Sequence, residues 1–321
     1  MKDVAIVGLP GAGKTTVFTA VSRGATRDAV AVVDVPDLRL ERIAEIYRSA
    51  RSVRAQVRLT DVAGLDPHSL GAARAADALA IVLRAFGPDA DVSEDLASFR
   101  AELAVADLAT IEKVLERASR GARTAEATLE VETCERAEAV LSDGRWLSSE
   151  DWTPEQRRVV SLWTPLTMKP DVFVINAEEP GIDPGDVPEP KVVICGALEA
   201  EATELDEEHA TALLREFGIT ELGADPFIRA AYEAIGLLTF FTASETEARA
   251  WEASRGYTAP QAAGVIHSDF ERGFIKAERV RYSDLLESGS EDEARRRGLV
   301  RLEGKDYEVR EGDILTIRHS S

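Results

Sequence analysis

The sequence predicts an α/β protein built around a parallel β-sheet, and three features support this. Short apolar runs at residues 4–7, 78–83, 172–175 and 192–194 are typical of strands that are buried on both faces of a sheet. Helical patterns alternate with these runs, which favours parallel strands joined by right-handed crossovers. The chain has 321 residues, of which 45% are hydrophobic and 30% charged. It is therefore long and apolar enough for about two domains with cores of their own.

The composition excludes several classes of protein. Acidic residues outnumber basic ones by 58 to 38, giving a net charge of −20, which argues against a general electrostatic grip on DNA or on an anionic membrane. Cys134 and Cys195 stand in unrelated contexts, so no disulfide framework or zinc knuckle is indicated. No apolar run approaches the roughly 20 residues of a membrane helix, and the N-terminus begins with a strand rather than a signal peptide. We expect a cytoplasmic protein with no DNA or membrane partner.

The predicted elements suggest three domains. A strand at residues 53–62 ends near Asp61, and a helical hairpin is predicted over 95–164, where Leu108, Ile111, Leu115 and Ala118 repeat at helical spacing. After Gly236 the pattern changes to short strands at 237–242, 249–253, 274–282, 299–302 and 307–317. We expect a nucleotide-binding domain at 1–94 and 165–235, a helical insertion at 95–164 and a small mixed-sheet domain at 236–321.

The densest basic spot in the last of these segments is Arg295-Arg296-Arg297. It is interpreted either as a solvated helix face or as a contact with nucleic acid.

The segment Gly8–Thr15 fits the phosphate-loop pattern G-x-x-x-x-G-K-T in full, and it lies between a buried strand and a helix predicted over Lys14–Ser22. Glycines let backbone N–H groups turn toward phosphates, and the helix N-terminus adds its positive end. Lys14 would reach the β- and γ-phosphates, and the Thr15 hydroxyl would bind Mg²⁺. The pattern predicts a P-loop nucleoside-triphosphate site. Its nucleotide-binding residues are Leu9, Pro10, Gly11, Ala12, Gly13, Lys14, Thr15 and Thr16.

Two further motifs follow later strands. Asp61-Val62-Ala63-Gly64 puts an acid at the carboxyl end of a strand, where it would hold Mg²⁺ together with Thr15, while Gly64 would let the backbone approach a γ-phosphate. Asn176-Ala177-Glu178-Glu179 stands where guanine-specific switches carry Asn-Lys-x-Asp. Because Ala177 and Glu179 replace Lys and Asp, a preference for GTP is in doubt. The motif is interpreted as a base-reading loop, or alternatively as an acidic turn before Pro180.

The order of these motifs is that of a GTPase-like fold, and the C-terminal segment indicates which family of that fold the chain resembles. The chain closely resembles the Obg-like ATPase (YchF) family over most of its length. The resemblance is carried by the segments Val35-Pro36-Asp37, Ala106–Lys113, Phe240–Ala243, Arg249–Trp251, Ala259–Glu278, Glu303–Tyr307 and Glu311–Asp313.

The resemblance implies a P-loop switch with a helical coiled-coil arm and a C-terminal TGS domain of β-grasp type. It implies ATP in preference to GTP, because the family's base-reading loop is Asn-x-x-Glu, matched by Asn176 and Glu179. It also implies that Ala177 and the segment Gly196, Ala197 and Leu198 lie beside the base. Association with ribosomes or ribosomal RNA is a further implication.

The chain departs from the family at its switches. Gly11 replaces an Asn that helps seat potassium, so potassium stimulation is not expected. The first switch is missing between residues 22 and 32, and the second is cut to 65–71. The loop at 87–91 lacks the family's His, and His68 is interpreted as a solvated residue rather than its replacement. Because phosphoryl transfer depends on positioning water and stabilising charge, binding should survive better than turnover. The alternatives are a slow Mg²⁺-dependent ATPase and a nucleotide-binding scaffold with little turnover.

Overall fold

The computed structural model describes residues 1–25, 28–119, 124–220 and 222–320. The chain forms two compact units: one comprises residues 2–31 and 58–231, and the other comprises residue 1, 32–57 and 232–321. Residues 32–57, predicted to belong to the N-terminal domain, thus join the unit of the C-terminal segment. The division into three domains stays a prediction. In the described part of the chain, no helix combines the length and the apolar character needed to span a bilayer.

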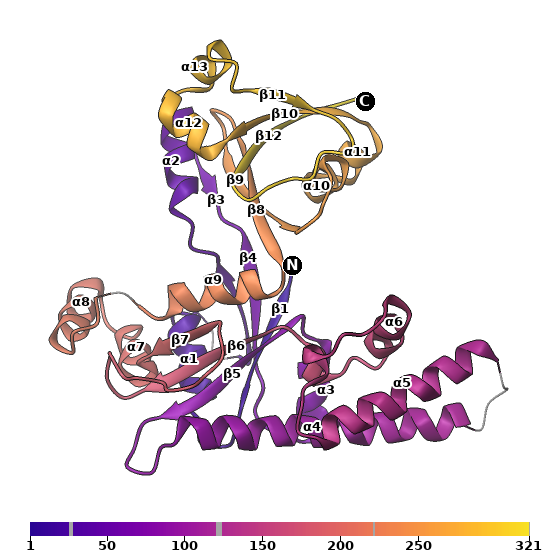
Figure 1. Ribbon diagram of the computed structural model, residues 1–321. Helices are drawn as coiled ribbons and strands as arrows, with labels where there is room; N and C mark the ends of the chain where they lie inside the picture. The colour runs from indigo at the N-terminus through magenta and orange to yellow at the C-terminus, as the bar shows by residue number, and fades with distance from the viewer. Residues whose placement is uncertain (26–27, 120–123, 221, 321) are drawn as a thin grey trace. The chain divides into compact units, whose positions relative to one another are not determined.

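The first sheet has six strands in the order β2-β4-β1-β5-β6-β7, of which β1, β5, β6 and β7 lie wholly in the larger unit (Figure 1). The pairs from β4 through β1, β5 and β6 to β7 are all parallel, as predicted. The strands are β1 (Asp3–Gly8), β2 (Val30–Asp34), β4 (Gln56–Asp61), β5 (Ala78–Ala85), β6 (Asp171–Ala177) and β7 (Lys191–Ile194).

Parallel pairing brings the motifs together, because parallel strands end at the same edge of a sheet. Gly8 ends β1, Asp61 ends β4 and Ala177 ends β6. Helix α1 (Lys14–Val21) follows β1, and α7 (Gly196–Ala202) follows β7. Helices α8 (Glu207–Glu216) and α9 (Ala224–Ala234) follow α7 along the chain.

One face of this sheet is covered by α3 (Pro67–Ala75) and by the first half of α4 (Val92–Ser119). Its core contains Leu79, Ile81 and Phe173 from the strands, with Phe99 from α4. Full burial of each large apolar side chain contributes about 1.5–3 kcal/mol. This packing fixes α3, which directly follows the Asp61–Gly64 motif.

The predicted helical hairpin is present, and α4 runs beside α5 (Ala125–Ser142) (Figure 1). Helix α4 begins at Val92, before the predicted 95, because the Asp91 carboxylate accepts from the backbone N–H groups of Ser93 and Glu94. The chain returns through η1 (Leu147–Ser149), α6 (Pro154–Leu162) and η2 (Leu166–Met168). A second apolar cluster joins these elements, and it contains Ile111, Cys134, Ala137, Val140, Leu141, Leu147, Trp152, Val160 and Trp163.

The smaller unit contains a mixed sheet with the order β11-β10-β12-β8-β9-β3. Its strands are β3 (Ser52–Val53), β8 (Leu237–Ala243), β9 (Ala248–Ser254), β10 (Phe274–Arg281), β11 (Arg301–Glu303) and β12 (Asp313–His319). Its helices are α2 (Leu38–Tyr47), α10 (Ala259–Ile266), α11 (Ser268–Arg272), α12 (Tyr282–Ser288) and α13 (Glu291–Arg296).

Three predicted strands differ from the structure. The segment 53–62 is not one strand, since Ser52 and Val53 pair with β9 while β4 starts at Gln56. The segment 307–317 becomes a strand only at Asp313, because its carboxylate accepts from the Tyr307 hydroxyl and from the Arg310 backbone N–H and so holds a turn. The strand predicted at 299–302 is β11, which is displaced by one or two residues.

The basic triplet lies at the end of α13, and all of its side chains form ion pairs. Arg295 pairs with Glu278 and Glu291, and the other two arginines pair with Glu293. Its charge is therefore balanced by neighbouring acids, as a solvated helix face would be.

Candidate nucleotide-binding site

The phosphate loop is held in a shape that only glycine allows at two positions. A Cβ at Gly8 would lie 2.5 Å from the Val82 carbonyl oxygen, and one at Gly13 would lie 2.2 Å from Asn176 Nδ2. Gly13 also has a φ of 81°, in the left-handed region, where it caps α1. These glycines therefore let the loop pass close to β5 and to the Asn176 side chain.

Lys14 lies inside this loop and is buried. Its Nζ donates to the carbonyl oxygens of Gly8 and Leu9, both at 3.2 Å. Burial lowers the pKa of the Lys14 ammonium, and the charge of Asp61 opposes that shift. A cation with two neutral carbonyl partners in a partly desolvated loop is well placed to attract an anion.

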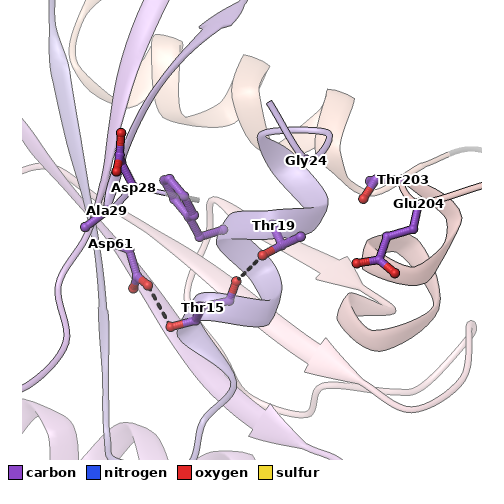
Figure 2. A pocket seen from close by; sticks show the side chains of 9 residues that line it. Thr15, Thr19, Gly24, Asp28, Ala29, Asp61, Thr203 and Glu204 are labelled. Carbon is purple, nitrogen blue, oxygen red and sulfur yellow. Dashed lines mark hydrogen bonds between the residues drawn. The ribbon is translucent and has the colours of Figure 1, made fainter. Parts of the chain in front are cut away.

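Thr15 in the first turn of α1 and Asp61 at the end of β4 meet at the start of α1. Thr15 Oγ1 donates to Asp61 Oδ2 at 2.6 Å, and Thr19 Oγ1 donates to the Thr15 carbonyl oxygen at 2.9 Å (Figure 2). The second carboxylate oxygen, Asp61 Oδ1, is buried without a hydrogen-bond partner. An orphaned carboxylate oxygen beside a threonine hydroxyl is the donor set that Mg²⁺ takes together with phosphate oxygens and water.

Among the described residues there is no group of three or more His, Cys, Asp or Glu side chains arranged as a metal cluster. Magnesium at Asp61 and Thr15 would thus depend on a bound triphosphate for its other ligands.

A cavity of about 470 Å³ adjoins this pair, and we call it the phosphate-side cavity (Figure 2). It is lined by Thr15, Phe18, Thr19, Gly24, Asp28, Ala29, Asp61, Thr203 and Glu204. Only Thr15 and Asp61 of this set carried a sequence signal. Part of the segment where the first switch is missing, residues 26–27, lies outside the described residues.

Asn176 connects the two ends of the site. Its side chain is buried, Nδ2 donates to the Ala12 carbonyl oxygen at 3.0 Å, and Oδ1 accepts from the Gly196 backbone N–H at 3.2 Å. One amide thus joins the phosphate loop to the loop that follows β7. Gly196 allows this approach, since a Cβ there would lie 2.5 Å from Asn176 Oδ1.

A second cavity of about 520 Å³ lies beside Asn176, and we call it the base-side cavity. Its lining includes six predicted residues, namely Gly13, Thr16, Asn176, Ala177, Ala197 and Leu198. It also includes four that were not predicted, namely Phe86, Gly87, Glu178 and Phe217. Phe217 ends α8 and is 46% exposed, so its ring is available to the cavity rather than buried in a core.

The other predicted residues do not line this cavity. Glu179, which follows Glu178 in the chain, is exposed. Gly196, which precedes the exposed Ala197, is buried. In the phosphate loop, Ala12 is buried, Leu9 is half-buried, and Pro10 and Gly11 are exposed. Gly64 is half-buried at the turn before α3.

The shortened second switch is largely helical. Asp66 caps α3 by accepting from the backbone N–H groups of His68 and Ser69, and Pro67 occupies the first turn. The hydrogen bond from the Ser69 hydroxyl contributes most to lowering the pKa of Asp66. His68 is an exposed residue of this helix, as expected for a solvated side chain.

Glu199 is a buried acid that belongs to none of the sequence motifs. It is 4% exposed, and Oε1 accepts from the Cys195 backbone N–H at 3.2 Å. Burial raises the pKa of Glu199, while backbone amides of Gly223, Cys195 and Ala224 oppose the shift. The buried carboxyl therefore holds Cys195, the N-cap of the helix α7 that carries Ala197 and Leu198.

Comparisons with known proteins agree with this geometry. A family model described as "50S ribosome-binding GTPase" matches residues 3–106. The model named YchF-GTPase_C, described as "Protein of unknown function (DUF933)", matches residues 237–320.

Curated relatives match nearly the whole chain. The "Ribosome-binding ATPase YchF" of Bacillus subtilis (strain 168) is 36% identical, with 98% of each chain covered. "Obg-like ATPase 1" of Oryza sativa subsp. japonica is 32% identical, covering 97% of this chain and 90% of that protein. The alignment with the Bacillus protein runs over 358 residues, against the 321 of this chain, so that relative contains segments that this chain lacks.

A solved structure agrees as well. The chain aligns with the "Structure of the Schizosaccharomyces pombe YchF GTPase" with a TM-score of 0.85 and 29% identity, covering 99% of this chain and 97% of that one. The phosphate loop, the sheet order and the near-complete matches to these relatives together establish that the chain belongs to the YchF family of Obg-like ATPases.

Proposed function

We propose that this chain binds a purine nucleoside triphosphate with Mg²⁺, prefers ATP to GTP, hydrolyses it slowly and associates with the ribosome. The observation that carries the proposal is the convergence of a complete phosphate loop with the Thr15–Asp61 pair and the base-side cavity at one edge of the sheet. Asn176 connects the two ends, because its amide bonds both to Ala12 of the phosphate loop and to Gly196 at the start of α7.

Each residue of the phosphate end has a defined task in this proposal. Lys14 exchanges its two carbonyl partners for β- and γ-phosphate oxygens, and backbone N–H groups between Pro10 and Thr15 hold the remaining charge. Asp61 and Thr15 hold Mg²⁺, which neutralises phosphate charge when it is bound. The buried position of Lys14 strengthens its attraction for the anion.

The preference for ATP rests on the base end. Guanine-specific sites hold an aspartate beneath the base, whereas this chain has the longer Glu179, which is exposed. Ala177 is buried in the wall of the base-side cavity and offers no cationic side chain. The apolar part of that cavity accepts either purine. Without the aspartate, the site lacks the contact that favours binding of guanine over adenine.

Slow turnover is supported by what surrounds the phosphate-side cavity. None of the described residues that line it is a histidine, and His68 is exposed on α3. A site that binds the phosphates without a group to orient water gives little acceleration of the chemical step.

Association with the ribosome is proposed from the relatives, several of which are named ribosome-binding ATPases. It is tested by co-sedimentation with ribosomes over a range of salt concentrations, because contacts with RNA phosphates strengthen as salt falls. Absence from the ribosome pellet even at low salt would remove this part of the proposal. Sedimentation without nucleotide, with ADP and with ATP then shows whether binding depends on the nucleotide.

The nucleotide part is tested by calorimetry with ATP and GTP on one preparation, with and without Mg²⁺, followed by measurement of phosphate release. A tenfold preference corresponds to about 1.4 kcal/mol. Lys14→Ala is the control for contaminating activity, and a wild-type rate no higher than that of the variant would exclude hydrolysis. Failure of the purified protein to bind any purine triphosphate would end the proposal as a whole.

A second function, a nucleotide-binding scaffold without useful turnover, is favoured by the segments that the chain lacks relative to the Bacillus protein. A scaffold should have the same conformation with ATP and with ADP. Limited proteolysis of the two complexes separates the alternatives, because a switch gives different cleavage patterns and a static scaffold gives the same one.

A further inference from the structure

Helix α3 connects the phosphate end of the site to a distant group of contacts. Its first turn is capped by Asp66, two residues after Gly64. Its last turn carries Arg74, roughly 12 Å farther along the helix axis at the usual helical rise. Because a short helix moves as a rigid body, a displacement of the Gly64 turn also displaces Arg74.

Arg74 makes three contacts with the segments at the root of the helical arm, by which we mean α4 and α5. Its Nη1 donates to the Thr164 carbonyl oxygen at 3.0 Å and pairs with Asp107 Oδ1 at 2.7 Å, while Nη2 donates to the Ala106 carbonyl oxygen at 2.9 Å. The side chain is only 18% exposed. Such a forked set of contacts suits a guanidinium and cannot be reproduced by a lysine.

Asp107 is the buried partner in this contact, with a side-chain exposure of 0%. Its carboxylate also accepts from the backbone N–H of Leu166 at 3.0 Å, and from the backbone N–H and the hydroxyl of Thr167, both at 2.8 Å. These donors satisfy the buried charge and attach η2 to α4. Asp107 thus lies where α4 passes from the core of the sheet, at Leu103, to the core of the hairpin, at Ile111.

The backbone that Arg74 binds is strained. Thr164 has a φ of 47°, a left-handed conformation that a β-branched residue before a proline rarely adopts. Strain of this kind persists only where surrounding contacts enforce it, and the hydrogen bond from Arg74 is such a contact. A second cation, Lys169, donates to the Ala76 carbonyl oxygen at the end of α3. The last turn of α3 is therefore tied to both ends of the 164–169 segment.

We propose that Arg74 and Asp107 are positioning residues that couple the phosphate end of the site to the root of the helical arm. A γ-phosphate that draws in the Gly64 turn shifts α3, loosens Arg74 from Thr164 and lets the strained segment relax. The inference rests on the proposed binding of ATP, and it adds the route by which the bound nucleotide changes the arm. Neither residue touches the nucleotide.

The test is hydrogen exchange measured by mass spectrometry on the full chain, with ADP and with a non-hydrolysable ATP analogue, each with Mg²⁺. The wild-type protein should show exchange that differs between the two complexes by about fivefold or more in peptides covering α3 and residues 160–170. Arg74→Met, which keeps the aliphatic stem, should bind both nucleotides with unchanged affinity but lose the difference at 160–170. Arg74→Lys should not restore it.

Arg117→Met is the matched control, because Arg117 also lies on the arm but is 71% exposed and forms its ion pair with Glu130 of α5. It should keep the wild-type difference. If Arg74→Met fails to fold, Asp107→Asn serves as the second variant, because it removes the charge that pairs with Arg74 and its one amide oxygen still accepts from either Leu166 or Thr167.

Two results overturn the coupling while leaving the proposed function intact. One is equal exchange at 160–170 in both wild-type complexes, with ATP binding confirmed by calorimetry. The other is an undiminished difference in a folded Arg74 or Asp107 variant. Failure of the wild-type protein to bind any nucleotide would instead contradict the proposed function and remove this inference with it.

Discussion

The phosphate end and the base end of the candidate site are built in different ways. The phosphate end consists of one continuous segment, Gly8–Thr15, completed by Asp61 from the neighbouring strand β4. The base-side cavity takes its walls from five separate places, namely the ends of β5, β6 and α8, the start of α7, and the phosphate loop with the start of α1. The first is fixed mostly by local sequence, and the second depends on how distant elements pack.

From this difference we expect the two ends to tolerate substitutions differently. At the phosphate end, backbone N–H groups are expected to do most of the binding, and their orientation depends on glycines at fixed spacing. At the base end, side chains from several elements supply mainly apolar surface, so a change at Ala177 is expected to alter selectivity without closing the cavity. Variants should therefore separate the two ends by their effect on inorganic tripolyphosphate, which has no base.

The largest effect is expected from Lys14→Ala. Removing the buried ammonium leaves the phosphates without their cation, and affinity for ATP, GTP and tripolyphosphate should each fall by about 100-fold or more. Titration calorimetry with all three ligands measures this. A loss confined to the nucleotides, with tripolyphosphate unaffected, would contradict a phosphate role for Lys14.

A smaller, selective effect is expected from the pair Ala177→Lys and Glu179→Asp. The shorter acid can sit beneath guanine, and the lysine stem can cover the base, so the ratio of ATP to GTP affinity should shift toward GTP by about tenfold. Competition of the two nucleotides against a fluorescent analogue measures the ratio. Tripolyphosphate affinity should stay constant, and an unchanged ATP-to-GTP ratio would show that these positions do not read the base.

Phe217→Ala should weaken ATP binding by about fivefold, because the half-exposed ring loses its stacking or edge contact with the purine. Tripolyphosphate binding should not change. Leu205→Ala is a suitable control, since Leu205 is similarly exposed but does not line the base-side cavity. Equal affinities of wild type and Phe217→Ala for ATP would remove Phe217 from the base end.

The same contrast determines how much could be predicted from sequence. The phosphate loop and Asp61 were predicted residue by residue because their spacing encodes their geometry, and the parallel sheet followed from apolar runs. Phe217 could not be predicted, because it lies at the end of a helix and reaches the cavity only through the packing of α8. Asn176 was predicted to contact the base, but the sequence did not reveal that its amide binds Ala12 and Gly196.

The fold shows the same limit. The run 53–62 has the composition of one strand, yet Ser52 and Val53 pair with β9 while Gln56–Asp61 joins β1. Only the competition between two sheets for one extended segment decides where it breaks, and this information lies outside the segment itself. Thr164 is similar, because it takes a left-handed conformation just after α6, where glycine is usual, and its carbonyl oxygen accepts from Arg74, which is distant in sequence.

The smallest predicted effect concerns Glu199, whose carboxyl accepts a hydrogen bond from Cys195 at the start of α7, beside the base-side cavity. Because burial raises its pKa above the ordinary 4.5, the folded state favours the protonated carboxyl more than the unfolded state does. The contribution of Glu199 to stability is therefore largest at low pH and falls as pH rises from 4.5 through the raised pKa. Glu199→Gln removes this titration and keeps an oxygen that can accept from Cys195.

The measured quantity is the melting temperature of the wild type minus that of Glu199→Gln, followed from about pH 5 to pH 8. This difference should decrease by roughly 2 °C or more as pH rises. Glu201→Gln, a change at an exposed position on the same helix, should give a difference that does not vary with pH. A wild-type advantage that grows with pH would mean that the buried carboxylate is better solvated by backbone amides than its burial suggests. In that case Cys195 at the start of α7 would be held by an ionised carboxylate rather than by a neutral acid.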